Sequence, residues 1–183
     1  MKTRLKKPPQ PHDPAWSVAF GEAQATLRTI LGADAKAIHH VGSTAIPGIW
    51  AKPVIDILIE ATSLVALDRR DAAFGEAGFI GKGEKGIAGR RFYIKDNYKG
   101  ARSHHVQAFE VSSPHIERHL AFRDYLLAHR PVASEYSRLK EAIAADWRGV
   151  DDYIERKASF VEQTERLALA WARGKACAQE GEA

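Results

Sequence analysis

The sequence predicts an α+β domain with α/β character, in which a small mixed sheet is backed by helices and followed by a C-terminal helical bundle. Strand-like apolar runs alternate with amphipathic segments as far as residue 112, and helical periodicity alone continues from residue 113 to about 174. The chain has 183 residues, of which 45% are hydrophobic, which suits one domain with its own core. We therefore expect a single domain over residues 14–174, with its sheet in 14–112 and its helical part in 113–174.

The individual elements follow from local patterns. Trp16 and Phe20 recur at helical spacing after Asp13, a favourable helix cap, and Gly32 is expected to end this helix. Ser63 is a favourable cap for a second helix. We expect strands near residues 37–41, 54–59, 78–80, 90–95 and 103–110, and helices near residues 14–31, 64–77, 114–130, 132–147 and 150–177.

The two ends of the chain differ in composition from the segment between them. Four of the first seven residues are Lys or Arg, and prolines stand at positions 8, 9, 11 and 14, so residues 1–13 are expected to form a flexible basic arm. Residues 175–183 are expected to form a flexible tail. The sequence shows no signal peptide and no apolar run long enough to cross a membrane, and its single cysteine fits a reducing compartment. We expect a cytoplasmic protein without a membrane partner.

One stretch, residues 39–60, combines several unusual features. Gly42 permits a close approach of the backbone to a ligand, and Ser43 offers a hydroxyl and an N–H, so this turn could cradle a phosphate. Asp56 lies in the apolar strand that follows, where a carboxylate is rarely buried unless it is paired or binds a metal. Lys52 either neutralises Asp56 or reaches a phosphate as a point charge. An aspartate at a strand end, satisfied by the backbone or by Lys52, would explain the pattern without a function.

The string HHVGSTAIPGIWAKPVIDILIE, residues 39–60, resembles the signature of the GrpB-like family. That family is assigned to the nucleotidyltransferase superfamily, and related domains occur fused to dephospho-CoA kinase. The resemblance covers roughly residues 14–172 and implies a minimal nucleotidyltransferase-like core that binds a nucleotide or another phosphorylated small molecule. It implies Asp56 and Ser43 as catalytic residues, Gly42 and Ser43 as phosphate ligands, and Asp56 with His105 as ligands of Mg²⁺ or Mn²⁺. His105 could instead form a hydrogen bond to a phosphate, or it could be a structural histidine.

Two positions depart from the patterns of the superfamily and the family. The superfamily pattern has a second carboxylate two residues after the first, where this chain has Leu58. The family carries two histidines one residue apart on a later strand; His105 matches the first, and Gln107 replaces the second. Glu60 shares a strand face with Asp56 but lies about 13 Å away at the rise of a strand, too far to hold the same ion. These departures favour an alternative, a catalytically inactive domain that binds an anionic ligand in the same pocket.

A further phosphate ligand is expected from the strand near residues 90–95. Arg91, Tyr93 and Lys95 alternate onto one face of that strand. If this face lines the Asp56 pocket, Arg91 could bind a phosphate through two parallel hydrogen bonds. If it does not, the three residues form a solvated strand face.

Further candidates lie in the helical part. Arg123 belongs to a string that resembles a recurring family element, and Tyr153 and Lys157 match the family's Tyr-x-x-x-Lys element. Together with Lys140, these residues could reach over the sheet to bind a phosphate. Ion pairs within the helical bundle are the alternative explanation for Arg123, Lys140 and Lys157.

The charge of the chain does not identify its partner. The formal net charge of +4 suits an anionic small molecule as well as a nucleic acid. We expect a nucleotide or another phosphorylated small molecule as the partner, and no nucleic acid. RNA binding through the basic arm is a third interpretation, for which a strong dependence of affinity on salt would be the sign.

Overall fold

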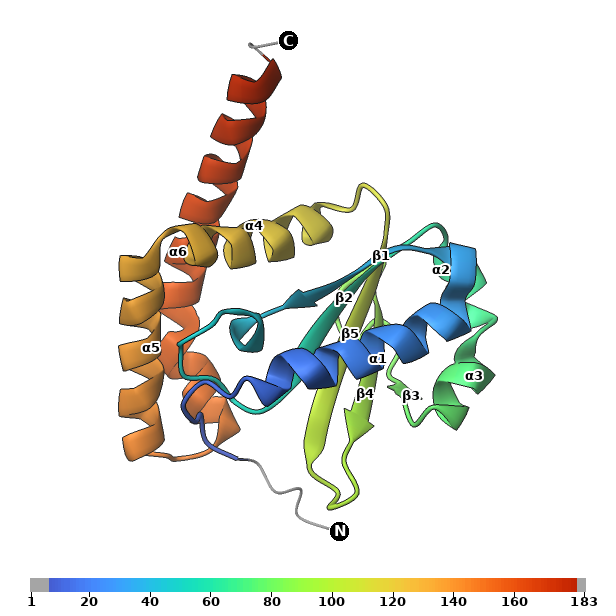
Figure 1. The fold of residues 1–183 in the computed structure, drawn as a ribbon, viewed down its shortest axis with the longest axis horizontal. Coiled ribbons are helices and arrows are strands. Elements are labelled where there is room, and N and C mark those ends of the chain that lie inside the picture. Colours follow the sequence, from blue (N-terminus) through green and yellow to red (C-terminus); the bar gives the residue numbers. More distant parts are fainter. Residues whose placement is uncertain (1–6, 181–183) are drawn as a thin grey trace.

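The computed structural model describes residues 7–180, which form helices around a five-stranded sheet (Figure 1). In chain order the elements are α1 (Ala15–Leu31), η1 (Gly32–Asp34), β1 (Ala35–Val41), η2 (Ser43–Ala45), β2 (Ile55–Ala61), α2 (Leu64–Asp68), α3 (Asp71–Glu76), β3 (Ile80–Gly81), β4 (Arg91–Asp96), β5 (Arg102–Glu110), α4 (Pro114–Ala128), α5 (Arg130–Ala145) and α6 (Val150–Glu180). The two η elements are single 3₁₀ turns. The α+β class is confirmed, with the sheet first and the helical part after it.

The sheet is mixed, with the strand order β1-β2-β5-β4-β3. β2 and β5 run parallel, and the other neighbouring pairs are antiparallel. The parallel pair places Asp56 opposite His105, although 48 residues separate them in the chain. Pairing of two central strands therefore creates the neighbourhood in which the candidate site lies.

One face of the sheet carries the main core. α1 lies across this face, and α2 and α3 cover it further along (Figure 1). Because side chains of a strand alternate between its two faces, Ile55, Ile57 and Ile59 of β2 all point into this core. Leu27 of α1 and Phe74 of α3 are fully buried against them. The same alternation sends Asp56, Leu58 and Glu60 to the other face.

The second face is only partly covered. Ile116 of α4 packs on Leu58 and Phe109, so this helix closes the end of the face that lies away from Asp56. α5 and α6 stand side by side at the opposite end of the molecule from α2 and α3 (Figure 1). Ile46 and Ile49, from the loop after β1, are buried among these helices. The loop thereby fixes the distance between the sheet and the helical bundle.

The outer edge of β1 is closed by side chains rather than by another strand. Gln24 donates to the carbonyl oxygen of Ile38 at 2.9 Å, and Arg28 donates to that of Ala35 at 2.6 Å. Arg123 of α4 donates to the carbonyl oxygen of His40 at 3.1 Å. These contacts satisfy carbonyl groups that would otherwise offer an edge for pairing with another chain.

The helix expected over residues 64–77 is instead two short helices. α2 ends at Asp68 and α3 begins at Asp71; between them the Arg70 guanidinium donates two hydrogen bonds to Asp34, at 2.9 and 3.1 Å. Ser63 makes no side-chain cap; the N–H of Leu64 donates instead to Glu110 at 3.0 Å. Tertiary contacts here outweigh a continuous helical periodicity.

The described part of the chain includes some residues of the expected arm and of the expected tail. Residues 1–6 and 181–183 lie outside the described part. Gln10 lies against the domain and exchanges two backbone hydrogen bonds with Ala51, each 2.9 Å long. α6 continues through the expected tail to Glu180 and projects beyond the other helices (Figure 1). Between residues 7 and 180, no helix combines the length and apolar character that crossing a bilayer would require.

Candidate functional site

A cleft opens where the Asp56 end of the sheet faces α5 and α6. Its cavity of about 270 Å³ is lined by side chains from the turn after β1, from β2 and β5, and from all three helices of the bundle. The lining residues that carry the argument below are Gly42, Ser43, Lys52, Asp56, His105, His119, Tyr136, Tyr153, Lys157 and Glu165. Seven of these were predicted from the sequence.

The turn after β1 forms one wall of the cleft. Gly42 has φ 70° and ψ −171°, a conformation that is essentially restricted to glycine. A Cβ atom on Gly42 would lie 2.6 Å from Oδ2 of Asp56, closer than any real contact allows. Nε2 of His40 and Oγ1 of Thr44 lie 2.9 Å apart and hold the following 3₁₀ turn in place. The glycine therefore lets the Asp56 carboxylate reach the phosphate-binding turn that the sequence predicts.

Asp56 and His105 form a hydrogen-bonded pair at the base of the cleft. Nδ1 of His105 donates to Oδ1 of Asp56 at 3.2 Å, and both side chains are partly exposed, at 30% and 34%. This contact follows directly from their opposite positions in the parallel ladder. With Nδ1 so engaged, Nε2 is the nitrogen of His105 left to meet a ligand.

The residues present do not fit a centre of two metal ions. Such a centre needs carboxylates shared by ions about 3.5–4 Å apart. Leu58 is fully buried under α4, Gln107 accepts a hydrogen bond from Arg90 at 2.9 Å, and Glu60 pairs with His39 at 2.7 Å. Among the side chains of residues 7–175, no group of three or more from His, Cys, Asp or Glu is placed to hold an ion. The two predicted metal ligands, Asp56 and His105, both line the cleft, as do His119 and Glu165.

The opposite wall of the cleft is basic. Nζ of Lys52 and Nζ of Lys157 lie 5.2 and 5.5 Å from the centre of the Tyr153 ring. Nζ of Lys140 lies 3.9 Å from the centre of the Tyr136 ring, one layer behind the cavity wall. Three lysines thus gather around two tyrosines on neighbouring helices.

Lys140 is the most unusual side chain of this wall. It is 0% exposed, and its ammonium has no hydrogen-bond partner within the described part of the chain. Burial, with a smaller contribution from the charge of Lys157, lowers the pKa of Lys140 well below its usual value. Burying a charged group without a hydrogen-bond partner costs free energy. The charge of the Lys140 ammonium is therefore poorly compensated in the ligand-free protein.

Two of the predicted site residues lie away from the cleft. Arg91 points to the opposite face of the sheet, where it binds Asp68 through two hydrogen bonds of 2.5 and 2.7 Å. The reason is Tyr93, whose ring stacks on Phe74 at 4.1 Å and fixes which face of β4 meets the core. Arg123 contacts the backbone of β1, as described above, and positions α4 instead of lining the cavity.

The position of Arg91 leads to a prediction. Arg91→Met should leave the affinity of the cleft for any anionic ligand unchanged, because the guanidinium lies on the other face of the sheet. The free energy of unfolding should fall by no more than about 1 kcal/mol, since the lost ion pair is partly exposed. Calorimetric titration and urea denaturation of the variant check both parts, and a clear loss of affinity would contradict the placement of β4.

The cleft also contains residues that the sequence analysis missed. His119 of α4 lines the cavity, its Nε2 is buried without a hydrogen-bond partner within residues 7–175, and burial lowers its pKa to about 4. Tyr136 is buried at the same wall. A signal for Tyr136 was available: Tyr136 and Lys140 repeat on α5 the Tyr-x-x-x-Lys spacing that Tyr153 and Lys157 show on α6. For His119, the only signal in the sequence was its helical spacing from Ile116.

Comparisons with known proteins agree with this architecture. A sequence model described as "GrpB protein" matches residues 10–166. UPF0157 protein YqkA of Bacillus subtilis is 43% identical over 161 residues, which cover 87% of this chain and 46% of YqkA, so the chain spans about half the length of that relative. A more distant relative, dephospho-CoA kinase of Mycolicibacterium paratuberculosis, is 26% identical over 88% of this chain and 46% of its own length.

A solved structure supports the same assignment. The crystal structure of the conserved protein GrpB from Enterococcus faecalis superposes with a TM-score of 0.83 at 32% identity, over 90% of this chain and 98% of that one. The fold described above is therefore the fold of that protein. Together with the sequence model that matches residues 10–166, this likeness shows that the chain belongs to the GrpB family.

Proposed function

We propose that this chain binds a nucleotide or another phosphorylated small molecule in the cleft. The phosphates lie between the Gly42–Ser43 turn and the two tyrosine–lysine pairs of α5 and α6. The observation that carries this proposal is Lys140, whose fully buried ammonium has no hydrogen-bond partner within residues 7–175 and lies close to Lys157. An anion in the adjacent cavity would offset a charge that the protein itself stabilises only through the Tyr136 ring.

The balance of charge in the cleft supports an anionic ligand. Lys52 and Lys157 line the cavity on one side, and Lys140 lies one layer behind that wall. Asp56 lies on the other side of the cavity, where its carboxylate accepts a hydrogen bond from His105. Glu165 lines the cavity too, but it is ion-paired with Arg118 at 3.3 Å. The wall where the phosphates are placed therefore carries basic side chains.

Thermal denaturation with a panel of probes tests the proposal. The panel contains inorganic tripolyphosphate, the common nucleoside triphosphates and dephospho-CoA, the last because one relative is named for it. A ligand at about 100 times its Kd should stabilise the protein by about 2.7 kcal/mol. Lys157→Met should abolish most of this stabilisation, because it removes a cation from the cavity wall.

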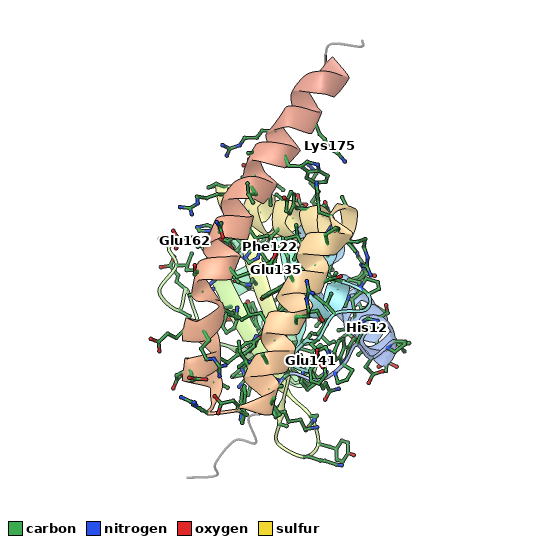
Figure 2. All side chains as sticks on the ribbon, turned by 90° about the vertical axis from the view of Figure 1, so that its left-hand side faces the viewer. His12, Phe122, Glu135, Glu141, Glu162 and Lys175 are labelled. Atoms are coloured by element: carbon green, nitrogen blue, oxygen red, sulfur yellow. The ribbon has the colours of Figure 1, made fainter. Side chains whose placement is uncertain are left out.

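A matched control lies on the same helix. Lys175 lies on the projecting end of α6, away from Phe122, which lines the cavity (Figure 2). Lys175→Met should therefore bind the panel as the wild type does. Equal losses in Lys157→Met and Lys175→Met would show that only general electrostatic attraction was measured. Absence of stabilisation by every probe would contradict the proposed function.

A second candidate function, nucleotidyl transfer, is favoured by one observation. The Asp56 carboxylate touches the phosphate-binding turn at Gly42 and also holds His105, so an acid and a base stand where a phosphate would lie. We include Mg²⁺ or Mn²⁺ in this candidate, although the described residues do not form a centre of two ions. The alternative is the catalytically inactive binding domain that Leu58 and Gln107 favour.

Pyrophosphate release distinguishes the two candidates. In nucleotidyl transfer, a hydroxyl group or water bonds to the α-phosphorus, the bond between the α- and β-phosphates breaks, and pyrophosphate leaves. Each nucleoside triphosphate that binds is therefore incubated with the wild type and with Asp56→Asn, with water and with added hydroxyl compounds as acceptors, and with and without Mg²⁺ or Mn²⁺. Transfer predicts metal-dependent release by the wild type and a loss of at least about 100-fold in Asp56→Asn, the size of effect expected for a positioned acid–base group. Binding without release, unchanged by Asp56→Asn, would support the inactive binding domain.

A further inference from the structure

A second cavity adjoins the cleft on the far side of His105. It measures about 380 Å³ and shares four lining residues with the first cavity, namely Lys52, Val54, His105 and Ile154. Its remaining walls come from the hairpin between β4 and β5, from the start of α6 and from Lys7 and Lys85. Because four residues line both cavities, the two cavities lie next to each other, and we refer to them as the first and second compartments.

The second compartment has apolar walls and a basic rim. Pro53, Val54, Ala101, Val150 and Ile154 supply the apolar surface. Ile154 is 53% exposed although it is a large apolar side chain, so part of this surface faces solvent. The basic residues are Lys7, Lys52, Lys85 and Arg102, of which Arg102 is paired with Asp96 at 2.6 Å. This combination suits a flat apolar group that carries a negative charge at one end.

Lys85 is the basic group best placed to receive that charge. Its backbone adopts φ 45°, a conformation that is uncommon outside glycine, within the loop that precedes β4. Its Nζ lies 4.5 Å from the centre of the Phe92 ring, and no carboxylate within residues 7–175 lies within ion-pair distance of it. Burial and the nearby charges of Arg90, Arg102 and Lys82 lower the pKa of Lys85, in that order of importance.

We propose that the natural ligand spans both compartments and carries anionic groups at both ends. One phosphate group lies in the first compartment, at the Gly42–Ser43 turn. The nucleoside lies on Val54 and Ile154 beside His105, and a second phosphate group lies at Lys85. The chemical class is a nucleotide with a second phosphate on its sugar. This inference rests on the proposed function and extends it from phosphate binding to a defined class of ligand.

The size of the compartments agrees with a ligand that occupies both. Pockets for small molecules generally measure about 300–1,000 Å³. The first compartment, at about 270 Å³, falls just below this range, and the second, at about 380 Å³, is near its lower end. The two compartments taken together lie well within it. His105 stands at their junction and would contact the middle of such a ligand.

Calorimetric titration with matched probes tests the inference. The probes are inorganic tripolyphosphate, the 5′-monophosphates of adenosine and uridine, and the corresponding 3′,5′-bisphosphates. For the base that binds better, the additional 3′-phosphate should raise the affinity of the wild type about tenfold, as a hydrogen-bonded charge contact does. Lys85→Met should abolish this gain, and it should leave the affinity for tripolyphosphate unchanged.

Two controls separate this inference from the proposed function. Lys82 lies in the same loop, is exposed and lines neither compartment, so Lys82→Met should retain the gain from the 3′-phosphate. Lys157→Met should lower the affinity of the protein for tripolyphosphate. If tripolyphosphate binds but the 3′-phosphate adds nothing, or if Lys85→Met and Lys82→Met lose the gain equally, the inference is overturned and the proposed function stands. If none of the probes binds, both are overturned.

Discussion

Lys140→Met is expected to stabilise the ligand-free protein and to weaken its binding of phosphate. The lysine is fully buried without a hydrogen-bond partner within residues 7–175, and methionine fills a similar volume without a charge. The free energy of unfolding at neutral pH should rise by about 1–3 kcal/mol, the usual cost of an unsatisfied buried polar group. The affinity for tripolyphosphate should fall by at least about tenfold. Urea denaturation and calorimetry measure the two effects.

The stability difference should depend on pH in a defined direction. Because the pKa of Lys140 is lowered in the folded protein, the unfolded chain binds more protons between that lowered pKa and the ordinary value of 10.5. The contribution of Lys140 to the free energy of unfolding of the wild type therefore becomes more favourable as the pH rises over this range. The advantage of Lys140→Met should be largest at low and neutral pH and shrink as the pH approaches 10.5.

Arg138 provides the control for this prediction. It lies on α5 as well but is exposed, and it does not line the cleft. Arg138→Met should change neither stability nor affinity by a comparable amount. A Lys140→Met variant that is less stable than the wild type and binds tripolyphosphate equally well would contradict the role assigned to Lys140. It would indicate that the lysine serves packing alone.

Gly42→Ala is expected to lower the free energy of unfolding by about 2–4 kcal/mol. The backbone of Gly42 occupies a region that costs other residues about 1–3 kcal/mol. The added Cβ would also lie 2.6 Å from Oδ2 and 3.1 Å from Cβ of Asp56, which adds the cost of overpacking. The carboxylate must move to relieve this contact, so the Asp56–His105 hydrogen bond should be lost. Urea denaturation and a crystal structure of the variant measure both consequences.

Gly89 separates the two contributions to this effect. Its φ of 72° is close to that of Gly42, but nothing lies within 4 Å of the position where its Cβ would be. Gly89→Ala should therefore lower the free energy of unfolding only through the unfavourable backbone conformation, by about 1–2 kcal/mol. Equal losses in the two variants, with Asp56 unmoved in Gly42→Ala, would show that close contact with the carboxylate is not what requires Gly42.

Local patterns in the sequence predicted the fold class and most of the elements. The resemblance of residues 39–60 to the GrpB signature implied Asp56, Ser43 and the turn, and the structure brings them to one cleft. The sequence could not show that β2 and β5 run side by side, because strand pairing depends on the whole topology. That pairing is what brings His105 to Asp56.

Tertiary packing decides the features that the sequence analysis placed wrongly or did not predict. Alternation along β4 correctly grouped Arg91 with Tyr93, but only the stacking of Tyr93 on Phe74 decides which face of the sheet the pair occupies. A single long helix was expected where Arg70 instead turns toward Asp34. The burial of Lys140 could not be predicted either, since exposed lysines on amphipathic helices are the norm.

A crystal structure of the protein with a bound non-hydrolysable analogue of ATP or UTP would test the central claim most directly. The account predicts that the phosphates lie in the cleft, contact the Gly42–Ser43 turn, and bring Lys157 or Lys140 within hydrogen-bond distance of a phosphate oxygen. A nucleotide bound with its phosphates elsewhere, while the ammonium of Lys140 stays buried without a partner, would contradict it.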